Sequence, residues 1–199
     1  MDHQPLYGIW QQFSLAVLAG LVLGALIIDV RQRRIPNILV VLTLCFGTLF
    51  NSLGPVLPDG GGLFTSAPGA LGASGAVLGA LTGLAVFLPL YLLRVMGAGD
   101  VKLLAGIGSF VGTLGVLNLV PFILAAGGLL AVVTMVWLKS TRQVLFNVSL
   151  AFNQMVSGQG GGFDPRQSVY RMPYTVAIAG GMLANGLWLL AGARPLIHF

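Results

Sequence analysis

Long apolar runs, separated by short polar segments, make up most of this chain. Most of the runs approach the roughly 20 apolar residues that a helix needs to cross a bilayer. The pattern predicts an all-α integral membrane protein with six transmembrane helices and a single domain over residues 1–199. The predicted spans are residues 13–30, 37–53, 71–93, 100–115, 116–138 and 173–191, with a long loop at 139–172.

The composition supports a membrane protein. Hydrophobic residues make up 56% of the chain and charged residues 8%, and the mean hydropathy is +0.93. Values this apolar exclude an ordinary soluble domain. The 29 glycines fit helices that pack closely in lipid, where small residues let backbones touch.

The basic residues predict the orientation. No Lys or Arg precedes Arg31, so the first apolar run lacks the basic start of a secretory signal and reads as an anchor with its N-terminus outside. The connections 31–36, 94–102 and 139–172 then lie inside and hold nine of the ten basic residues, whereas Arg194 lies outside with the C-terminus. This distribution follows the positive-inside rule. It accounts for the formal charge of +5 without a nucleic-acid partner.

Two of the five acidic residues occupy helix ends at the predicted inner face. Asp29 ends the first span and Asp100 begins the fourth. A carboxylate in a membrane span is costly, at about 3 kcal/mol at the bilayer centre, and marks a candidate functional site. The competing interpretation is that Asp29 pairs with Arg33 and Asp100 with Lys102 as charges beside the membrane.

If the two carboxylates meet, they form a pair suited to peptide hydrolysis. Like charges in proximity cannot easily both ionise, so such a pair shares a proton. The ionised member takes a proton from an attacking water, and the protonated member stabilises and protonates the developing groups.

The residues around both acids resemble one family. Gly97-Ala98-Gly99-Asp100 fits the GxGD motif of intramembrane aspartic proteases. Asp29 followed by Arg34-Ile35-Pro36-Asn37 resembles the first aspartate motif of prepilin peptidases. Lys102, and Met172-Pro173-Tyr174 at the start of the last span, are also similar to that family. The resemblance covers essentially the whole chain.

The resemblance implies a type IV prepilin peptidase of the bacterial inner membrane, which cuts the leader from prepilins at the cytoplasmic face. It implies that Asp29 and Asp100 are the catalytic pair and that Gly97 and Gly99 shape the turn through which the substrate reaches Asp100. The short form resembles the tight-adherence (Flp) branch. Larger members carry an N-terminal segment with cysteine pairs and methylate the new N-terminus, so we do not expect methyltransferase activity here.

The polar residues near the two acids each have two possible interpretations. Lys102 could stabilise an ionised Asp100 or reach lipid phosphates. Asn37, after Pro36, could hydrogen-bond near Asp29 or cap the second helix. Arg34 is a topology determinant or a substrate contact. The single cysteine, Cys45, excludes an intramolecular disulfide and a Cys-rich zinc site, and we expect no metal or cofactor.

Rival interpretations belong to other classes. A small ion-coupled transporter also carries intramembrane acids, but more naturally near the midplane in broken helices. A non-enzymatic component of pilus or secretion assembly needs no pair of acids. A presenilin-like protease shares GxGD, but its first aspartate usually follows tyrosine, whereas Ile28 precedes Asp29 here.

Overall fold

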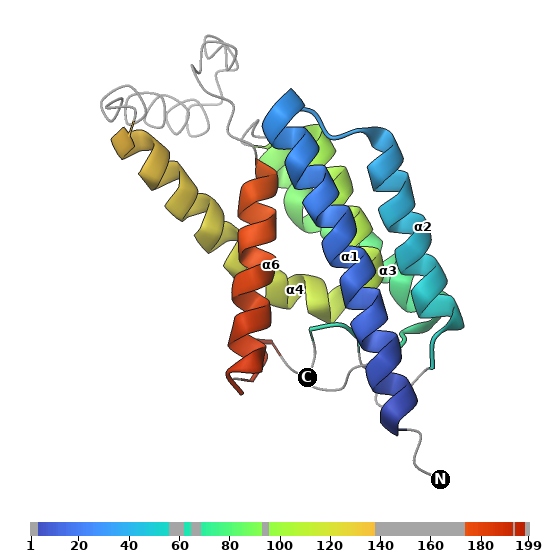
Figure 1. Ribbon diagram of the computed structural model, residues 1–199. Helices are drawn as coiled ribbons and strands as arrows, with labels where there is room; N and C mark the ends of the chain where they lie inside the picture. Colours follow the sequence, from blue (N-terminus) through green and yellow to red (C-terminus); the bar gives the residue numbers. More distant parts are fainter. Residues whose placement is uncertain are drawn as a thin grey trace.

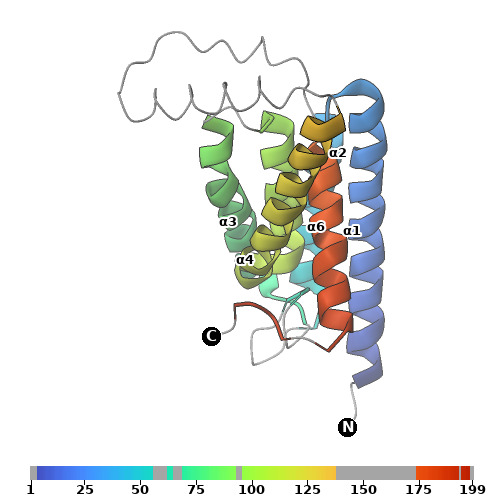
Figure 2. The same ribbon diagram turned by 90° about the vertical axis from the view of Figure 1, so that its left-hand side faces the viewer.

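The computed structural model describes residues 4–55, 62–64, 69–92, 96–137, 174–192 and 194–197. This part of the chain is all-helical, as the apolar runs predict (Figures 1 and 2). The helices are α1 (Gln4–Gln32), α2 (Asn37–Leu53), α3 (Gly72–Leu92), α4 (Ala98–Trp137) and α6 (Tyr174–Leu190). The predicted loop 139–172 and Pro173 lie outside the described residues.

Within the described part of the chain, three helices are long and apolar enough to cross a membrane. They cover Gly8–Gln32, Gly72–Leu92 and Ala98–Thr134, and α2 and α6 are shorter apolar helices. Large side chains on their surfaces, such as Leu129 and Leu190, are exposed, as lipid-facing residues are in a protein without its bilayer. These helices indicate a membrane protein.

The first helix is longer than predicted. The prediction began at residue 13, but α1 begins at Gln4. Pro5 lies in the first turn, where proline is tolerated, and a single glycine, Gly8, costs only about 1 kcal/mol in a helix. Its polar residues, such as Gln11 and Gln12, are good helix formers, so polarity does not end the helix. In contrast, α2 has the predicted bounds, Asn37–Leu53.

Helix α4 contains the boundary between the predicted fourth and fifth spans. Its backbone breaks at Gly112, with φ 71° and ψ 179°, whereas the prediction placed the boundary between residues 115 and 116. Glycine adopts a positive φ at no steric cost, which explains why the break falls on this residue. The arm 113–137 then runs back toward the end at which the arm 98–111 begins (Figure 1).

The arm 98–111 lies at the centre of the bundle. Its side chains Leu103, Ile107 and Phe110 are almost fully buried. Helix α3 crosses it so closely that a methyl group added at Gly79 would overlap the carbonyl oxygen of Gly108, and one at Gly108 would overlap that of Gly79. Small residues that let two backbones touch are typical of helix packing in lipid.

The turn between α1 and α2 has a defined backbone. Arg33 has φ 53°, and its N–H donates to the carbonyl oxygen of Asp29 over 2.7 Å. This is the left-handed helix end usually formed by glycine. Ile35 precedes Pro36, which disfavours helical backbone at Ile35, and Pro36 stands at the N-cap of α2 in an extended conformation.

This turn gives a prediction for stability. Arg33→Gly and Arg33→Val both remove the arginine side chain, but only valine must adopt the positive φ at a steric cost. We expect the glycine variant to be the more stable by about 1–2 kcal/mol, measured by thermal unfolding in detergent. Equal melting temperatures would show that the positive φ is not needed in the folded protein.

The end of the bundle opposite this turn is fixed by two buried asparagines. Asn51 donates to the carbonyl oxygen of Ser109 over 2.7 Å and accepts from the N–H of Leu71 over 3.0 Å. Asn118 donates to the carbonyl oxygen of Ile197 over 3.0 Å and accepts from its N–H over 2.8 Å. The Asn51 bonds join α2 to α4 and to the residue before α3, and the Asn118 bonds hold the C-terminal segment at the end where α1 begins.

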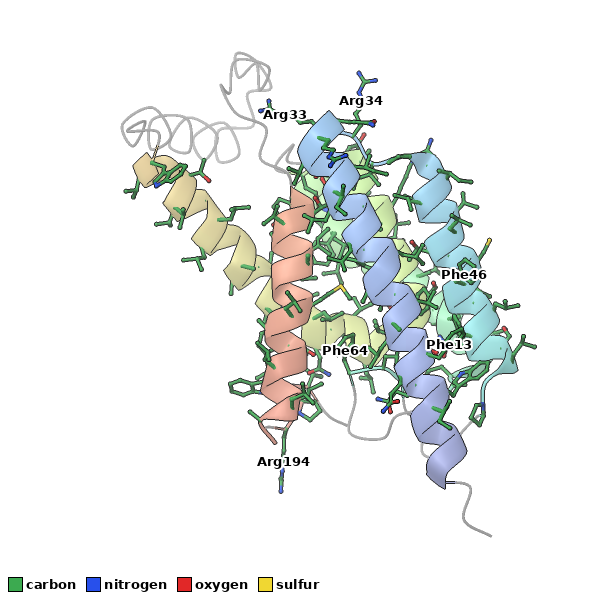
Figure 3. All side chains as sticks on the ribbon, in the orientation of Figure 1. Phe13, Arg33, Arg34, Phe46, Phe64 and Arg194 are labelled. Atoms are coloured by element: carbon green, nitrogen blue, oxygen red, sulfur yellow. The ribbon has the colours of Figure 1, made fainter. Side chains whose placement is uncertain are left out.

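The arginines labelled in Figure 3 lie at two opposite ends of the helix bundle. Arg33 and Arg34 lie at the α1–α2 turn, whereas Arg194 lies at the opposite end (Figure 3). Lys102 belongs to the start of α4 and therefore to the same end as the first two. Of the five described basic residues, Arg31, Arg33, Arg34 and Lys102 thus lie at one end of the bundle, and Arg194 lies at the other.

Candidate active site

Asp29 lies in the last turn of α1 and is buried, with 6% of its surface exposed. The Thr175 hydroxyl, from the start of α6, donates to Asp29 Oδ2 over 2.5 Å. The helix end itself does not favour this carboxylate, because the last carbonyls of a helix carry partial negative charge. The hydrogen bond from α6 therefore compensates in part for an unfavourable position.

Asp100 lies in the first turn of α4 and is 9% exposed. The N–H of Gly97 donates to Asp100 Oδ2 over 3.2 Å, and the start of a helix favours negative charge. Among the residues that the structure describes, none donates a hydrogen bond to the buried Asp100 Oδ1. This buried oxygen therefore keeps an unused hydrogen-bond acceptor among the described residues.

The two carboxylates occupy the same end of the bundle, where α1 ends and α4 begins (Figure 1). They are close enough for the charge of Asp29 to act on Asp100. The turns that carry them also touch, since a methyl group added at Gly99 would lie 3.2 Å from Ile35 Cβ. Two buried acids that are far apart in the sequence thus lie close to each other at one end of the bundle.

The glycines before Asp100 have distinct roles in this geometry. A methyl group at Gly97 would lie 3.0 Å from Asp100 Oδ2, the oxygen that accepts the Gly97 N–H. Gly99 lies against Ile35 instead. Gly97 therefore leaves room for the carboxylate, and Gly99 for the α1–α2 turn.

The other motif residues do not enter the pair in this structure. Arg34, Asn37 and Lys102 are exposed, and Pro36 is half-buried. Lys102 follows Asp100 by two positions, and residues at that spacing do not face each other on a helix. This argues against the interpretation in which Asp100 is neutralised by Lys102.

Sequence reasoning missed the part of α6 that completes the site. Thr175 bonds directly to Asp29, and the neighbouring Tyr174 is close enough to feel the charge of Asp100. The available signal was topological, because the last span starts at the same face as both acids. The motif containing Tyr174 was noted, but its contact with the pair was not expected.

The chemistry open to this site is that of a carboxylate pair. Among the described residues, no group of three or more His, Cys, Asp or Glu side chains is placed to hold a metal ion. Two interacting carboxylates can hold one proton between them and exchange it with a bound reactant.

The apolar bundle and its buried acids define a membrane protein with a candidate aspartyl site. Residues 16–136, more than half of the chain, match the type IV leader peptidase family. The chain therefore belongs to this family, which implies a peptidase with prepilin substrates. The matched segment contains both acids and both motif glycines, but ends before α6. Searches of curated proteins and of solved structures find no match to the chain.

Proposed function

We propose that the protein is a membrane-embedded aspartic endopeptidase with Asp29 and Asp100 as its catalytic residues. The observation that carries the proposal is the pairing of these two buried acids at one end of an apolar bundle. A single buried carboxylate would be energetically costly in such an apolar environment. Two interacting carboxylates can instead share a proton for catalysis, and both lie in the segment that matches the leader peptidase family.

The proposed reaction uses one water and the shared proton. The ionised carboxylate takes a proton from the water while the oxygen of that water attacks the scissile carbonyl carbon. The protonated carboxyl group donates its proton to the carbonyl oxygen, giving a tetrahedral intermediate. The intermediate collapses as the C–N bond breaks and a proton passes to the departing amine. In this reaction Asp100 Oδ1, which has no hydrogen-bond donor among the described residues, would contact the water or the carbonyl oxygen.

The proposed substrates are type IV prepilins, in particular the small prepilins of the tight-adherence (Flp) branch. Such a substrate joins a polar leader to an apolar helix. The apolar helix can remain in the bilayer while the junction with the leader reaches the carboxylate pair at the end of the bundle. The site would therefore cut at the membrane face and not at the midplane.

The proposed topology has six spans, both chain ends outside and the pair at the cytoplasmic face of the bacterial inner membrane. The two arms of α4 supply the fourth and fifth spans, because the chain reverses at Gly112 (Figure 1). The orientation is supported by the basic residues of the α1–α2 turn, since cytoplasmic segments are enriched in Lys and Arg.

The test is co-expression with a small Flp-type prepilin, following leader removal by gel and mass spectrometry. Wild type is expected to release the leader at a single bond, and Asp29→Asn and Asp100→Asn to leave the prepilin intact at normal membrane levels. Cleavage that survives either substitution would remove that residue from the mechanism. Failure of the wild type on a panel of such prepilins would overturn the substrate class.

Gly99 gives a further prediction about this activity. Gly99→Val is expected to slow leader cleavage at least about tenfold, because its branched side chain would push Ile35 and shift the turns that carry the two acids. The matched control is Ala98→Val, which adds bulk at the neighbouring exposed position. The measurement is the cleavage rate at equal membrane levels. Equal rates for both variants would show that the contact between Gly99 and Ile35 does not position the pair.

A further inference from the structure

Thr175 makes an unusual contact for a hydroxyl in an apolar helix. It is fully buried, with 0% exposed, and it donates to a carboxylate 146 positions away in the sequence over 2.5 Å. It also lies outside residues 16–136, the segment that matches the family. Neither the family match nor the aspartate motifs assign it a role.

Two other buried hydroxyls make their short hydrogen bonds within their own helices. Thr43 donates to the Leu39 carbonyl oxygen over 2.7 Å. Ser109 lies 2.7 Å from the carbonyl oxygen of Gly106 and, at a longer 3.4 Å, from that of Thr43 on α2. Such bonds are the ordinary way in which Ser and Thr satisfy a hydroxyl inside a helix. Thr175 instead reaches across from α6 to the end of α1.

The bond matters because of where Asp29 stands. Its carboxylate lies in the last turn of α1, where the helix field opposes negative charge. A hydroxyl donor stabilises the ionised form and restricts the rotation of the side chain. Hydrogen bonds to charged groups are also stronger than those between neutral groups.

We propose that Thr175 is a positioning residue that holds the Asp29 carboxylate in its reactive orientation through the hydrogen bond from its hydroxyl group. This inference rests on the proposed function, because it gives Thr175 a part in the same reaction. It assigns α6 to the site: Thr175 binds one carboxylate, and Tyr174 beside it lies within reach of the charge of the other.

The test uses the full chain, purified in detergent, with a small Flp-type prepilin as substrate. Thr175→Val keeps the shape of the side chain and removes the hydroxyl, whereas Thr175→Ser keeps the hydroxyl. We expect the valine variant to lose about ten- to a hundredfold in kcat, the usual effect of deleting a hydrogen bond to a charged group, with KM nearly unchanged. The serine variant is expected to recover kcat to within about threefold of wild type.

The matched control is Thr43→Val, which makes the same change at an equally buried threonine on α2. It is expected to keep the wild-type kcat. Thermal unfolding checks that each variant is folded, and Thr175→Ala replaces the valine variant if that one does not accumulate.

Three results would overturn the proposal: an unchanged kcat in Thr175→Val, a serine variant as slow as the valine variant, or a loss confined to KM. Asp29→Asn, assayed alongside, separates this outcome from failure of the proposed function. If Asp29→Asn is inactive while Thr175→Val is fully active, the proposed catalytic role of Asp29 is supported and only the proposed role of Thr175 is wrong.

Discussion

Asp29→Asn and Asp100→Asn are each expected to lower kcat for leader cleavage by about a thousand- to ten-thousandfold, and the double variant is expected to be no slower than either single one. The reason is that one proton is shared by two groups. An amide can neither take the proton from water nor return it to the departing amine. The loss of either carboxylate therefore disables both roles, and residues that act as a unit show non-additive effects.

The substitutions are chosen to preserve the fold. Asparagine keeps an oxygen that can accept a hydrogen bond. At position 29 the donor is the Thr175 hydroxyl, and at position 100 it is the Gly97 N–H. The substitution also removes a buried charge. We therefore expect melting temperatures at or above that of wild type, measured in detergent. The control for removal of an acid is Asp59→Asn. Asp59 lies between the second and third predicted spans, a connection that the predicted orientation places outside, and this variant should cleave normally.

Additive losses in the double variant would contradict a shared-proton pair. They would indicate that each carboxylate acts on its own, for example with only one of them in catalysis and the other binding substrate. A residual activity that is equal in all three variants would instead measure what the rest of the site contributes by orienting the substrate.

The sequence alone could predict the two acids because charge is rare in this chain. Asp29 and Asp100 each interrupt an apolar run at a helix end, and the topology inferred from basic residues places those ends at one face. Thr175 gives no such signal, since a hydroxyl in an apolar helix usually bonds to its own backbone. Only the packing of α6 against α1 shows that its partner is a carboxylate.

Helix boundaries were predictable where a turn residue marks them. Pro36 sets the start of α2, and the prediction was right to the residue. The boundary inside α4 was wrong by a few residues, because Gly112 and Gly115 are equally good candidates in an apolar run. The choice between them depends on tertiary packing, since Gly112 lies against the Leu71 side chain and against α3 at Gly79.

The second large effect is expected in the contact between α3 and α4. Gly79→Val is expected to destabilise the folded protein by about 3 kcal/mol or more, seen as a large fall in melting temperature in detergent and a loss of protein from the membrane. A side chain at this position has no space, because it would overlap the backbone of Gly108 and Gly112. Backbone atoms cannot move aside as the end of a flexible side chain can, so the two helices must separate.

Gly20→Ala in α1 is the matched control, because nothing lies within 4 Å of a methyl group added there. It is expected to be neutral or to stabilise the helix by up to about 1 kcal/mol, as replacing glycine in a helix does. If Gly79→Val melts like Gly20→Ala, the close crossing of α3 and α4 does not exist in the folded protein.

The same crossing links packing to catalysis. The arm of α4 that Gly79 supports begins with the turn that holds Asp100, so separation of the helices would move one carboxylate while α1 keeps the other. Gly79→Ala, with a smaller side chain, is therefore expected to lose cleavage activity before it loses its fold. A variant that keeps full activity at a clearly lowered melting temperature would show that the position of Asp100 is set by the α1–α2 turn and not by α3.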